Sequence, residues 1–308
     1  MSIAEVRRDH HLTTVAELGE DWELSLTADN KSEATRMTYL AAVHQLAEFL
    51  AVSGMPVEAV HVTREHVEAF LVELLATRSA STAKTRHGAL KTFFAWCVED
   101  GEISRSPMEH IRPPKVPEVP IPLLSDDQLK AILATCAGRD FQSLRDNALI
   151  RLFCESGLRR AEVANMTLED LDLVDDVIRV VRKGRRVSHV SFGSKTKLAL
   201  KRYLRARNHH RYAAGTDHVW LGKVGPITPD GLFQMIQRRG AQAGIEGLHP
   251  HMLRHAAVQF WLANGGSEGD AMKIFGWRNR AMLDRYAAAG AEGRAIAAHH
   301  AMAPGDRF

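Results

Sequence analysis

A cluster of prolines divides this chain into two parts. Six of its eleven prolines lie between Pro107 and Pro122. Proline locks φ and has no backbone N–H, so a stretch this rich in proline continues neither a helix nor a central strand. Such a stretch forms a semi-rigid, extended spacer. The sequence therefore predicts a linker at 106–122, between one domain at 1–105 and a second at 123–308.

The first domain is predicted to be a bundle of about four helices. Helical spacing of apolar residues begins near Thr13 and recurs until Gly101, and Ser79 can cap the fourth segment. This fourth helix is expected to expose the basic residues of its N-terminal half. These residues, with the two basic residues of the linker, are Lys84, Arg86, His87, Lys91, Arg112 and Lys115. They are candidate contacts to DNA phosphates, although an ordinary solvated surface has the same pattern.

The composition indicates a globular protein without a membrane span or disulfides. Hydrophobic residues make up 45% and charged residues 25% of the 308 positions, and no run of eighteen apolar residues occurs. The start, MSIAEVRRDHH, has no apolar segment of a secretory signal. Three separate cysteines in apolar segments indicate buried thiols in a reducing cytoplasm. The sixteen histidines lack ligand spacing, so no metal site is predicted, and a net charge of +3 does not by itself imply nucleic acid.

The second domain is predicted to combine helices with a small antiparallel sheet. Ser125 and Gln128 have the spacing of a capping box, so one helix begins there, and a second helix ends at Gly157. Three short strand-like runs separated by turns predict the sheet. The predicted strands are 168–173, 177–181 and 187–192, and the later helices are the basic segment 195–213 and the segment 230–243.

A stretch near the C-terminus carries residues suited to phosphoryl chemistry. Pro250 can begin a helix, and His251 and Arg254 then share one face because they are three positions apart. Trp277 follows, and Tyr286 comes nine residues after it. An arginine fork binds phosphate oxygens, histidine moves a proton near neutral pH, and tyrosine can be a covalent nucleophile. Each residue alone fits a core or surface role, but their order and spacing favour a site that binds and attacks a phosphate group.

This order resembles the C-terminal signature of the tyrosine recombinases, the phage-integrase and Xer family. The family pattern is H-x-L-R-H, then G-H or G-W, and then nine residues to Tyr. The matching residues are His251-Met252-Leu253-Arg254-His255, Gly276-Trp277 and Tyr286. The first domain is also similar in layout to the core-binding domain of the family, with Ser32, Thr35 and Tyr39 in an S-x-x-T-x-x-x-Y pattern.

The segment 157–162 resembles a second family box. It has the sequence G-L-R-R-A-E, which is similar to G-L-R-x-x-E. The resemblance makes Arg159 the first catalytic arginine and Glu162 the structural neighbour that can hold its guanidinium. Arg160 is a competing candidate, but it lies outside the register of the box.

The turn R-K-G-R-R resembles the hairpin that carries the family's catalytic lysine, usually written G-K-G-x-K. This assigns Lys183 as the lysine and leaves Arg185 as a candidate DNA contact. Arg182 replaces the glycine of the pattern, and Ser191 replaces the usual proline near the end of the next strand. Neither replacement is expected to touch the chemistry.

The resemblance implies a mainly α fold with a small antiparallel β-sheet. It implies a helical, SAM-like core-binding domain at 1–105 and a mixed α+β catalytic domain at 123–308. The C-terminal tail of the catalytic domain either docks on a neighbouring protomer or folds back on its own domain. The implied catalytic residues are Arg159, Lys183, His251, Arg254, Trp277 and Tyr286.

The resemblance also implies DNA cleavage without metal, ATP or another cofactor. Two arginines would hold the non-bridging phosphate oxygens in place of a metal. Tyr286 would attack the phosphate, with His251 as the base and Lys183 as the acid, to give a 3′-phosphotyrosyl link and a free 5′-hydroxyl. Trp277 stands where many relatives have histidine, and its indole N–H can donate a hydrogen bond but cannot move a proton.

The implied partner is double-stranded DNA that contains short core sites. A homotetramer would join two sites through a Holliday junction, and the chain off DNA would be a monomer or weak oligomer. A directionality protein is a candidate accessory partner, and the expected location is the cytoplasm of a bacterium, on its nucleoid. The leading hypothesis is an integrase of a phage or other mobile element, and the alternative is a Xer-like resolvase of chromosome or plasmid dimers. A DNA-binding protein without catalysis and a type IB topoisomerase are the competing classes.

Overall fold

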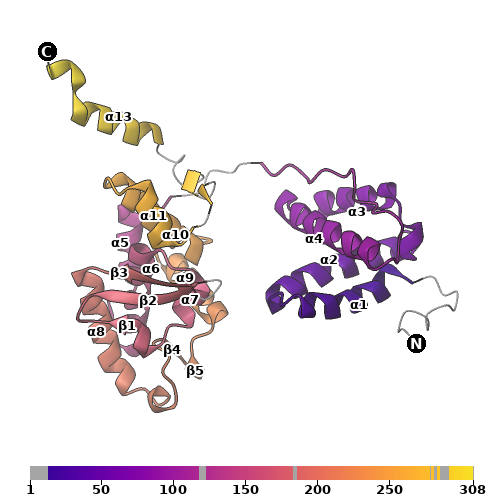
Figure 1. Cartoon of the computed structure of the whole chain (residues 1–308). Helices are drawn as coiled ribbons and strands as arrows, with labels where there is room; N and C mark the ends of the chain where they lie inside the picture. The colour runs from indigo at the N-terminus through magenta and orange to yellow at the C-terminus, as the bar shows by residue number, and fades with distance from the viewer. Residues whose placement is uncertain are drawn as a thin grey trace. The chain divides into compact units, whose positions relative to one another are not determined.

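The computed structural model describes residues 13–117, 123–182, 186–277, 279–280, 283–284 and 291–307. Contacts divide the chain into two compact units, Met1–Val119 and Pro120–Phe308. The described part of the first unit is built on helices, and the second unit adds short strands (Figure 1). None of the described helices is long and apolar enough to cross a membrane.

Four α-helices form the described part of the first unit. They are α1 (Val15–Ala28), α2 (Glu33–Val52), α3 (Arg64–Thr77) and α4 (Ala80–Glu99), with a 3-10 turn at Ala59–His61 between α2 and α3. Side-chain oxygens of Thr14, Ser32 and Ser79 accept backbone N–H groups at the starts of α1, α2 and α4. Each such cap satisfies a donor that the helix itself leaves free. The predicted bundle and the predicted cap at Ser79 are confirmed.

An aromatic cluster fills the core of this bundle. Trp22 of α1 is 2% exposed, and its ring stacks on Tyr39 of α2 with 5.5 Å between centroids. The ring of Phe93 on α4 lies 5.3 Å from Trp22. Rings at such separations attract one another beyond the gain from burial. Leu24, two positions after Trp22, is 77% exposed, because only one face of α1 meets the core.

The predicted exposure of His87 on α4 is wrong. Its side chain is 4% exposed, and its Nε2 atom lies 2.9 Å from the carbonyl oxygen of Ile111. Met108 and Ile111 are themselves buried in the core of the bundle. The first part of the segment 106–122 therefore packs against this unit, and His87 is buried because it holds that segment.

The other basic residues of this unit differ in exposure. Arg86 is half-buried, and its guanidinium donates to the side chain of Gln45 at 2.8 Å and to the backbone carbonyl of Thr38 at 3.0 Å. This guanidinium thus joins α4 to α2. The remaining candidates are exposed, and they are Lys84, Lys91, Arg112 and Lys115. Their contact with DNA stays a prediction.

The second unit has a hydrophobic core separate from that of the first unit. The described helices are α5 (Asp126–Ala134), α6 (Phe141–Ser156), α7 (Arg160–Ala164), α8 (Ser194–Asn208), α9 (Pro229–Gln242), α10 (Pro250–Ala263), α11 (Glu268–Phe275) and α13 (Ala291–Met302). The capping box of Ser125 and Gln128 starts α5 as predicted. Helix α6 is central, because it packs against both α8 and α10, and its Leu149 and Phe153 are fully buried.

A three-stranded antiparallel sheet, in the order β1-β2-β3, lies beside these helices (Figure 1). Its strands are β1 (Leu171–Asp172), β2 (Val177–Arg182) and β3 (Arg186–Ser191), and a second hairpin pairs β4 (Leu221–Gly222) with β5 (Gly225–Pro226). Val177 pairs with Ser191 at one end of the β2–β3 ladder, and Arg182 pairs with Arg186 at the other. The buried side chains of Ile178 and Val180 alternate with more exposed ones, so one face of β2 packs on the core.

Two predicted elements of this unit are shorter than expected. The run 168–173 begins as a 3-10 turn, Leu168–Asp170, and only Leu171–Asp172 is a strand. The side chain of Asp170 accepts the backbone N–H of Thr167 at 3.0 Å, and this contact closes the turn. The basic helix predicted at 195–213 ends at Asn208.

The three cysteines are free thiols. Cys97 and Cys136 are buried, as predicted, and Cys154 is half-buried. Burial raises the pKa of Cys97 to about 12. This side chain is therefore an uncharged thiol at neutral pH and packs as a small apolar group.

Candidate active site

The first candidate catalytic segment begins where α6 ends. Gly157 adopts a φ of 55°, and a Cβ there would lie 2.6 Å from the ring of Phe275. Only glycine fits both the left-handed conformation and the close approach. The turn makes Arg159 the N-cap of α7. Glu162 accepts the backbone N–H of Arg159 at 2.8 Å and its guanidinium at 2.9 Å, so both ends of this arginine are held at the start of α7.

The second segment is the first turn of α10. Pro250 lies in this turn, where its missing N–H costs no hydrogen bond. His251 is exposed, whereas Arg254 on the same helix is 3% exposed. The guanidinium of Arg254 donates to the carbonyl of Gly157 and, at 2.6 Å, to that of Phe275. One buried fork therefore joins the end of α6 to the end of α11.

Three arginines from separate segments donate to three consecutive backbone carbonyls at the end of α11. The pairs are Arg182 with Ile274 at 2.5 Å, Arg254 with Phe275 at 2.6 Å and Arg159 with Gly276 at 3.4 Å. The last carbonyls of a helix lack partners within it and form the negative end of its dipole. The end of α11 therefore gathers cations from β2, from α10 and from the turn before α7.

Trp277 packs beside these arginines. It is 7% exposed, and its backbone N–H donates to the carbonyl of Met272 at 2.9 Å. The Cζ atom of Arg254 lies 5.5 Å from the centre of the Trp277 ring, a cation–π geometry. The centre of the Phe275 ring also lies 5.5 Å from that of Trp277. Trp277 thus limits the movement of Arg254, and its contact with a phosphate stays a prediction.

Partial desolvation of the ring and nearby positive charge lower the pKa of His251, although the side chain stays in contact with solvent. Desolvation is the largest cause, and the charges of the His249 ring, Arg254, Arg160 and Arg159 add to it. The lower pKa favours the neutral imidazole near pH 7, which is the form that accepts a proton. Among the described residues, no group of three or more His, Cys, Asp or Glu is placed to hold a metal ion.

The predicted residues fall into three groups in the structure. The residues of the first group lie together at the end of α11, and they are Arg159, Glu162, Arg254 and Trp277. His251 lies three residues before Arg254 on the same helix. Lys183, Arg185 and Tyr286 lie outside the described residues.

Arg160, the competing candidate beside Arg159, points away from this cluster. Its guanidinium donates to Asp230 at 3.1 Å and lies 5.7 Å from the ring centre of Phe233, so it packs on α9. Arg182, in contrast, joins the cluster, although the sequence predicts no role for it. Its signal in the sequence is the replacement of a glycine by a long cationic residue directly before Lys183.

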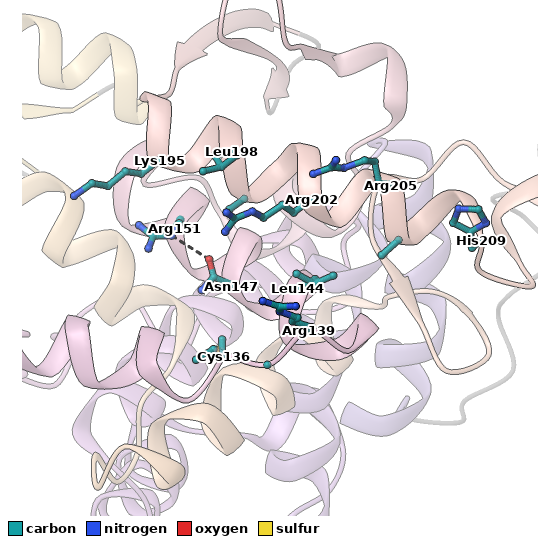
Figure 2. Close-up of a pocket in the computed structure, with 14 residues that line it drawn as sticks. Cys136, Arg139, Leu144, Asn147, Arg151, Lys195, Leu198, Arg202, Arg205 and His209 are labelled. Carbon is teal, nitrogen blue, oxygen red and sulfur yellow. Dashed lines mark hydrogen bonds between the residues drawn. The ribbon is translucent and has the colours of Figure 1, made fainter.

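The basic residues of α8 form a different site. A cavity lies between α8, α6 and the loop before α6, and Figure 2 shows the side chains that line it. Its volume is about 730 Å³. Its basic lining residues are Arg139, Arg151, Lys195, Arg202, Arg205 and His209, and its described lining contains no carboxylate. Within that lining, Arg151 donates to Asn147 at 3.0 Å. Arg207 of the same helix is buried instead, where it donates to the carbonyls of Thr216 and His218.

Segments of both units match known protein families. Residues 122–292 match the phage integrase family, and residues 18–102 match the phage integrase N-terminal SAM-like domain. A tyrosine recombinase XerC from Azotobacter vinelandii is 34% identical over 64% of this chain, and the alignment spans 66% of that relative's length.

Solved structures show the same fold at lower identity. The XerH site-specific recombinase bound to a palindromic difH substrate has a TM-score of 0.73 at 18% identity, over 93% of this chain and 84% of that one. A λ integrase tetramer bound to a Holliday junction has a TM-score of 0.70 at 16% identity, over 90% of this chain and 80% of that one. These likenesses confirm the mainly α fold with a small antiparallel sheet. The match over residues 122–292, more than half of the chain, shows that this chain belongs to the phage integrase family of tyrosine recombinases.

Proposed function

We propose that this chain is a site-specific recombinase that cleaves and rejoins duplex DNA through a covalent tyrosine link. The main support is the convergence of Arg159 and Arg254 at the end of α11, beside Trp277. Two guanidinium forks at one place suit a phosphate that gains negative charge during attack. The family match over residues 122–292 leads to the same assignment.

The two arginines would contribute in different ways. The side chain of Arg159 is 43% exposed, and the contact of its Nη2 with Gly276 is long at 3.4 Å. Nη2 can therefore pass to a phosphate oxygen at small cost while Nη1 stays on Glu162. Arg254 is 3% exposed and donates to two backbone carbonyls, so its charge is fixed in place. A fixed fork and an adjustable fork would together hold the two non-bridging oxygens.

The covalent step needs a nucleophile, a base and an acid. The Oη atom of Tyr286 would attack the phosphorus and lose its proton to neutral His251. The bond from phosphorus to the 5′-oxygen would break, and the ammonium of Lys183 would give that oxygen a proton. The products are a 3′-phosphotyrosyl link and a free 5′-hydroxyl. The link conserves the energy of the broken bond, so religation would require no ATP and no other cofactor.

The substrate and assembly follow from this chemistry as parts of the proposal. The chain would bind two short core sites in duplex DNA and act as a homotetramer through a Holliday junction, as the λ integrase tetramer is bound to one. Off DNA it would be a monomer or weak oligomer, with a directionality protein as a candidate accessory partner. It would act in the bacterial cytoplasm, on nucleoid DNA. The proposed phosphate contacts are Lys84, Lys91, Arg112, Lys115 and Arg185, of which the first four are exposed.

Two biological roles use this activity. We propose integration and excision of a phage or other mobile element as the first. Resolution of chromosome or plasmid dimers is the alternative, and the 34% identity to a XerC recombinase supports it. Adduct formation on a given DNA separates these roles, because each role has its own core site.

Covalent trapping tests the chemistry. The full chain is incubated in EDTA with a nicked suicide duplex from DNA that flanks its gene, and adducts are resolved on a denaturing gel. We expect a shifted band for the wild type and for Tyr212→Phe, and no band for Tyr286→Phe, which should still bind DNA. Tyr212 is the matched control because it undergoes the same chemical change and packs under Arg211.

Each outcome decides between hypotheses. An adduct with Tyr286→Phe would refute the nucleophile, and a strict Mg²⁺ requirement would refute the arginine mechanism. A band only with a chromosomal dimer-resolution site would favour the Xer-like role. Relaxation of a plasmid without exchange between two sites would favour a type IB topoisomerase, and tight binding without any adduct would favour a DNA-binding protein.

A further inference from the structure

Arg182 links the two strands of the β2–β3 hairpin to the end of α11. Its Nε donates to the Oγ of Ser188, on β3, at 2.6 Å. Its Nη2 donates to the carbonyl of Ile274, on α11, at 2.5 Å. The donor residue is the last of β2 and directly precedes Lys183 in the sequence. A single guanidinium therefore connects both strands beside Lys183 to the helix that leads to Trp277.

The third nitrogen of this guanidinium fits a space that only glycine leaves open. Nη1 of Arg182 is buried and has no hydrogen-bond partner among the described residues. A Cβ on Gly276 would lie 1.4 Å from it, which is far inside van der Waals contact. The side chain of Arg182 therefore occupies the place that any other residue at 276 would need.

This position is electrostatically unfavourable for a cation. Burial lowers the pKa of Arg182, and the positive charges of Arg159 and Arg186 lower it further, while the carboxylate of Glu162 raises it. Ordinary packing would place an apolar side chain here at less cost. The family pattern has glycine at this position, which offers no side chain for such a link. The arginine thus adds side-chain hydrogen bonds to Ser188 and Ile274 that a glycine could not make.

We propose that Arg182 is a positioning residue that fixes the hairpin so that Lys183 can protonate the leaving 5′-oxygen. This inference rests on the proposed function. In the cleavage step, the bond between the Tyr286 oxygen and phosphorus forms while the bond to the 5′-oxygen breaks, and a proton passes from Lys183 to that oxygen. Without the two contacts of Arg182, the hairpin moves more freely and Lys183 is less often in place.

A change of leaving group separates this role from a merely structural one. A core site with sulfur at the bridging 5′ position releases a thiolate, which is far more stable than an alkoxide and needs no acid (a thiol has a pKa of about 8.5). A defect that comes from a misplaced Lys183 should therefore disappear with the sulfur substrate. A defect in folding, DNA binding or the arginine cluster should remain with both substrates.

The experiment measures single-turnover cleavage of oxygen and sulfur suicide duplexes by the full chain. The variants are Arg182→Met, Ser188→Ala, Lys183→Met and, as the matched control, Arg179→Met. Arg179 lies on the same strand, but its guanidinium pairs with Asp170 at 2.8 Å. Arg182→Met keeps an unbranched apolar stem, is shorter by the guanidinium, and removes the charge and all donors.

We expect Arg182→Met to cleave the oxygen substrate roughly 10- to 100-fold more slowly, a part of the usual effect of general acid catalysis. It should cleave the sulfur substrate within about 3-fold of wild type, as should Lys183→Met. Ser188→Ala should show a smaller defect with the same dependence on the leaving group. Arg179→Met should match wild type on both substrates.

Three results would overturn the inference. They are wild-type cleavage of the oxygen substrate by Arg182→Met, an equal defect of that variant on both substrates, and failure of sulfur to rescue Lys183→Met. If Arg182→Met does not fold, the rates of Ser188→Ala on the oxygen and sulfur substrates test the inference instead, because this variant removes only one acceptor of Arg182. Absence of an adduct with the wild type on both substrates would instead refute the proposed function.

Discussion

A Cβ on Gly276 would lie 1.4 Å from Nη1 of Arg182. The glycine has a φ of 67°, so it also ends α11 in a left-handed conformation that other residues avoid. Two requirements therefore meet at this glycine, one from its own backbone and one from a side chain of β2. The G-W pair of the family signature and the replacement of a family glycine by Arg182 are thus physically connected.

We predict that Gly276→Ala destabilises the second unit more than Gly247→Ala does. Gly247 has nearly the same φ, 68°, but a Cβ on it would meet no atom within 4 Å. Both substitutions should cost about 1–2 kcal/mol for the left-handed backbone. Gly276→Ala should cost about 1–3 kcal/mol more, because Arg182 must leave its two acceptors. Urea unfolding of the full chain measures both costs.

A double-mutant cycle checks the cause of this difference. In an Arg182→Ala background the clash is absent, so Gly276→Ala should cost no more than Gly247→Ala. The coupling energy should then be about 1 kcal/mol or more. A coupling energy near zero would show that Arg182 does not restrict residue 276.

The neighbouring arginines Arg159 and Arg160 should differ sharply in their effects on cleavage. Arg159→Met should abolish adduct formation, because its guanidinium is held by Glu162 at the arginine cluster. Arg160→Met should retain it, because that guanidinium pairs with Asp230 on α9. The measurement is adduct yield on the suicide duplex, with DNA binding as the control. The reverse result would mean that the G-L-R-x-x-E register assigns the wrong arginine.

Sequence patterns predict what depends on near neighbours in the chain. The caps at Ser79 and Ser125 and the turn at Gly157 are confirmed, because each is made by residues a few positions apart. The burial of His87 is not predicted, because its partner, the carbonyl of Ile111, belongs to a segment beyond the end of α4. A periodic helix pattern contains no information about such a partner.

The candidate site shows the same limit. The family boxes give Arg159 and Arg254 by their spacing to nearby residues, and the structure connects both to the end of α11. The contact of Arg182 with Ile274 joins residues 92 positions apart in the sequence. No local pattern specifies that contact, so only the folded chain shows why an arginine at this position matters.

The lowered pKa of His251 predicts how the rate of adduct formation changes as the pH falls. A lower pKa means that the neutral base persists as the pH falls through the ordinary value of about 6.5. The rate of adduct formation should therefore stay level through that pH and decline only below it. Single-turnover rates at protein and DNA concentrations below saturation, between about pH 5 and 8, measure this, because they report the pKa of the protein before it binds DNA. His251→Gln should be slow throughout and lack the acid decline, and a wild-type midpoint at or above about 6.5 would contradict a depressed pKa.

The cationic cavity of Figure 2 predicts a substitution that stabilises the second unit. Arg202 and Arg205 lie three positions apart on α8, and the described lining around them contains no carboxylate. Arg202→Glu replaces repulsion by attraction, so it should raise the free energy of unfolding by about 0.5 kcal/mol at low salt. Arg179→Glu, the same change of charge at an arginine paired with Asp170, should lower it. Both effects should vanish in about 1 M NaCl, because the screening length falls to about 3 Å there. A gain in stability that survives high salt would mean that packing, and not charge, is its source.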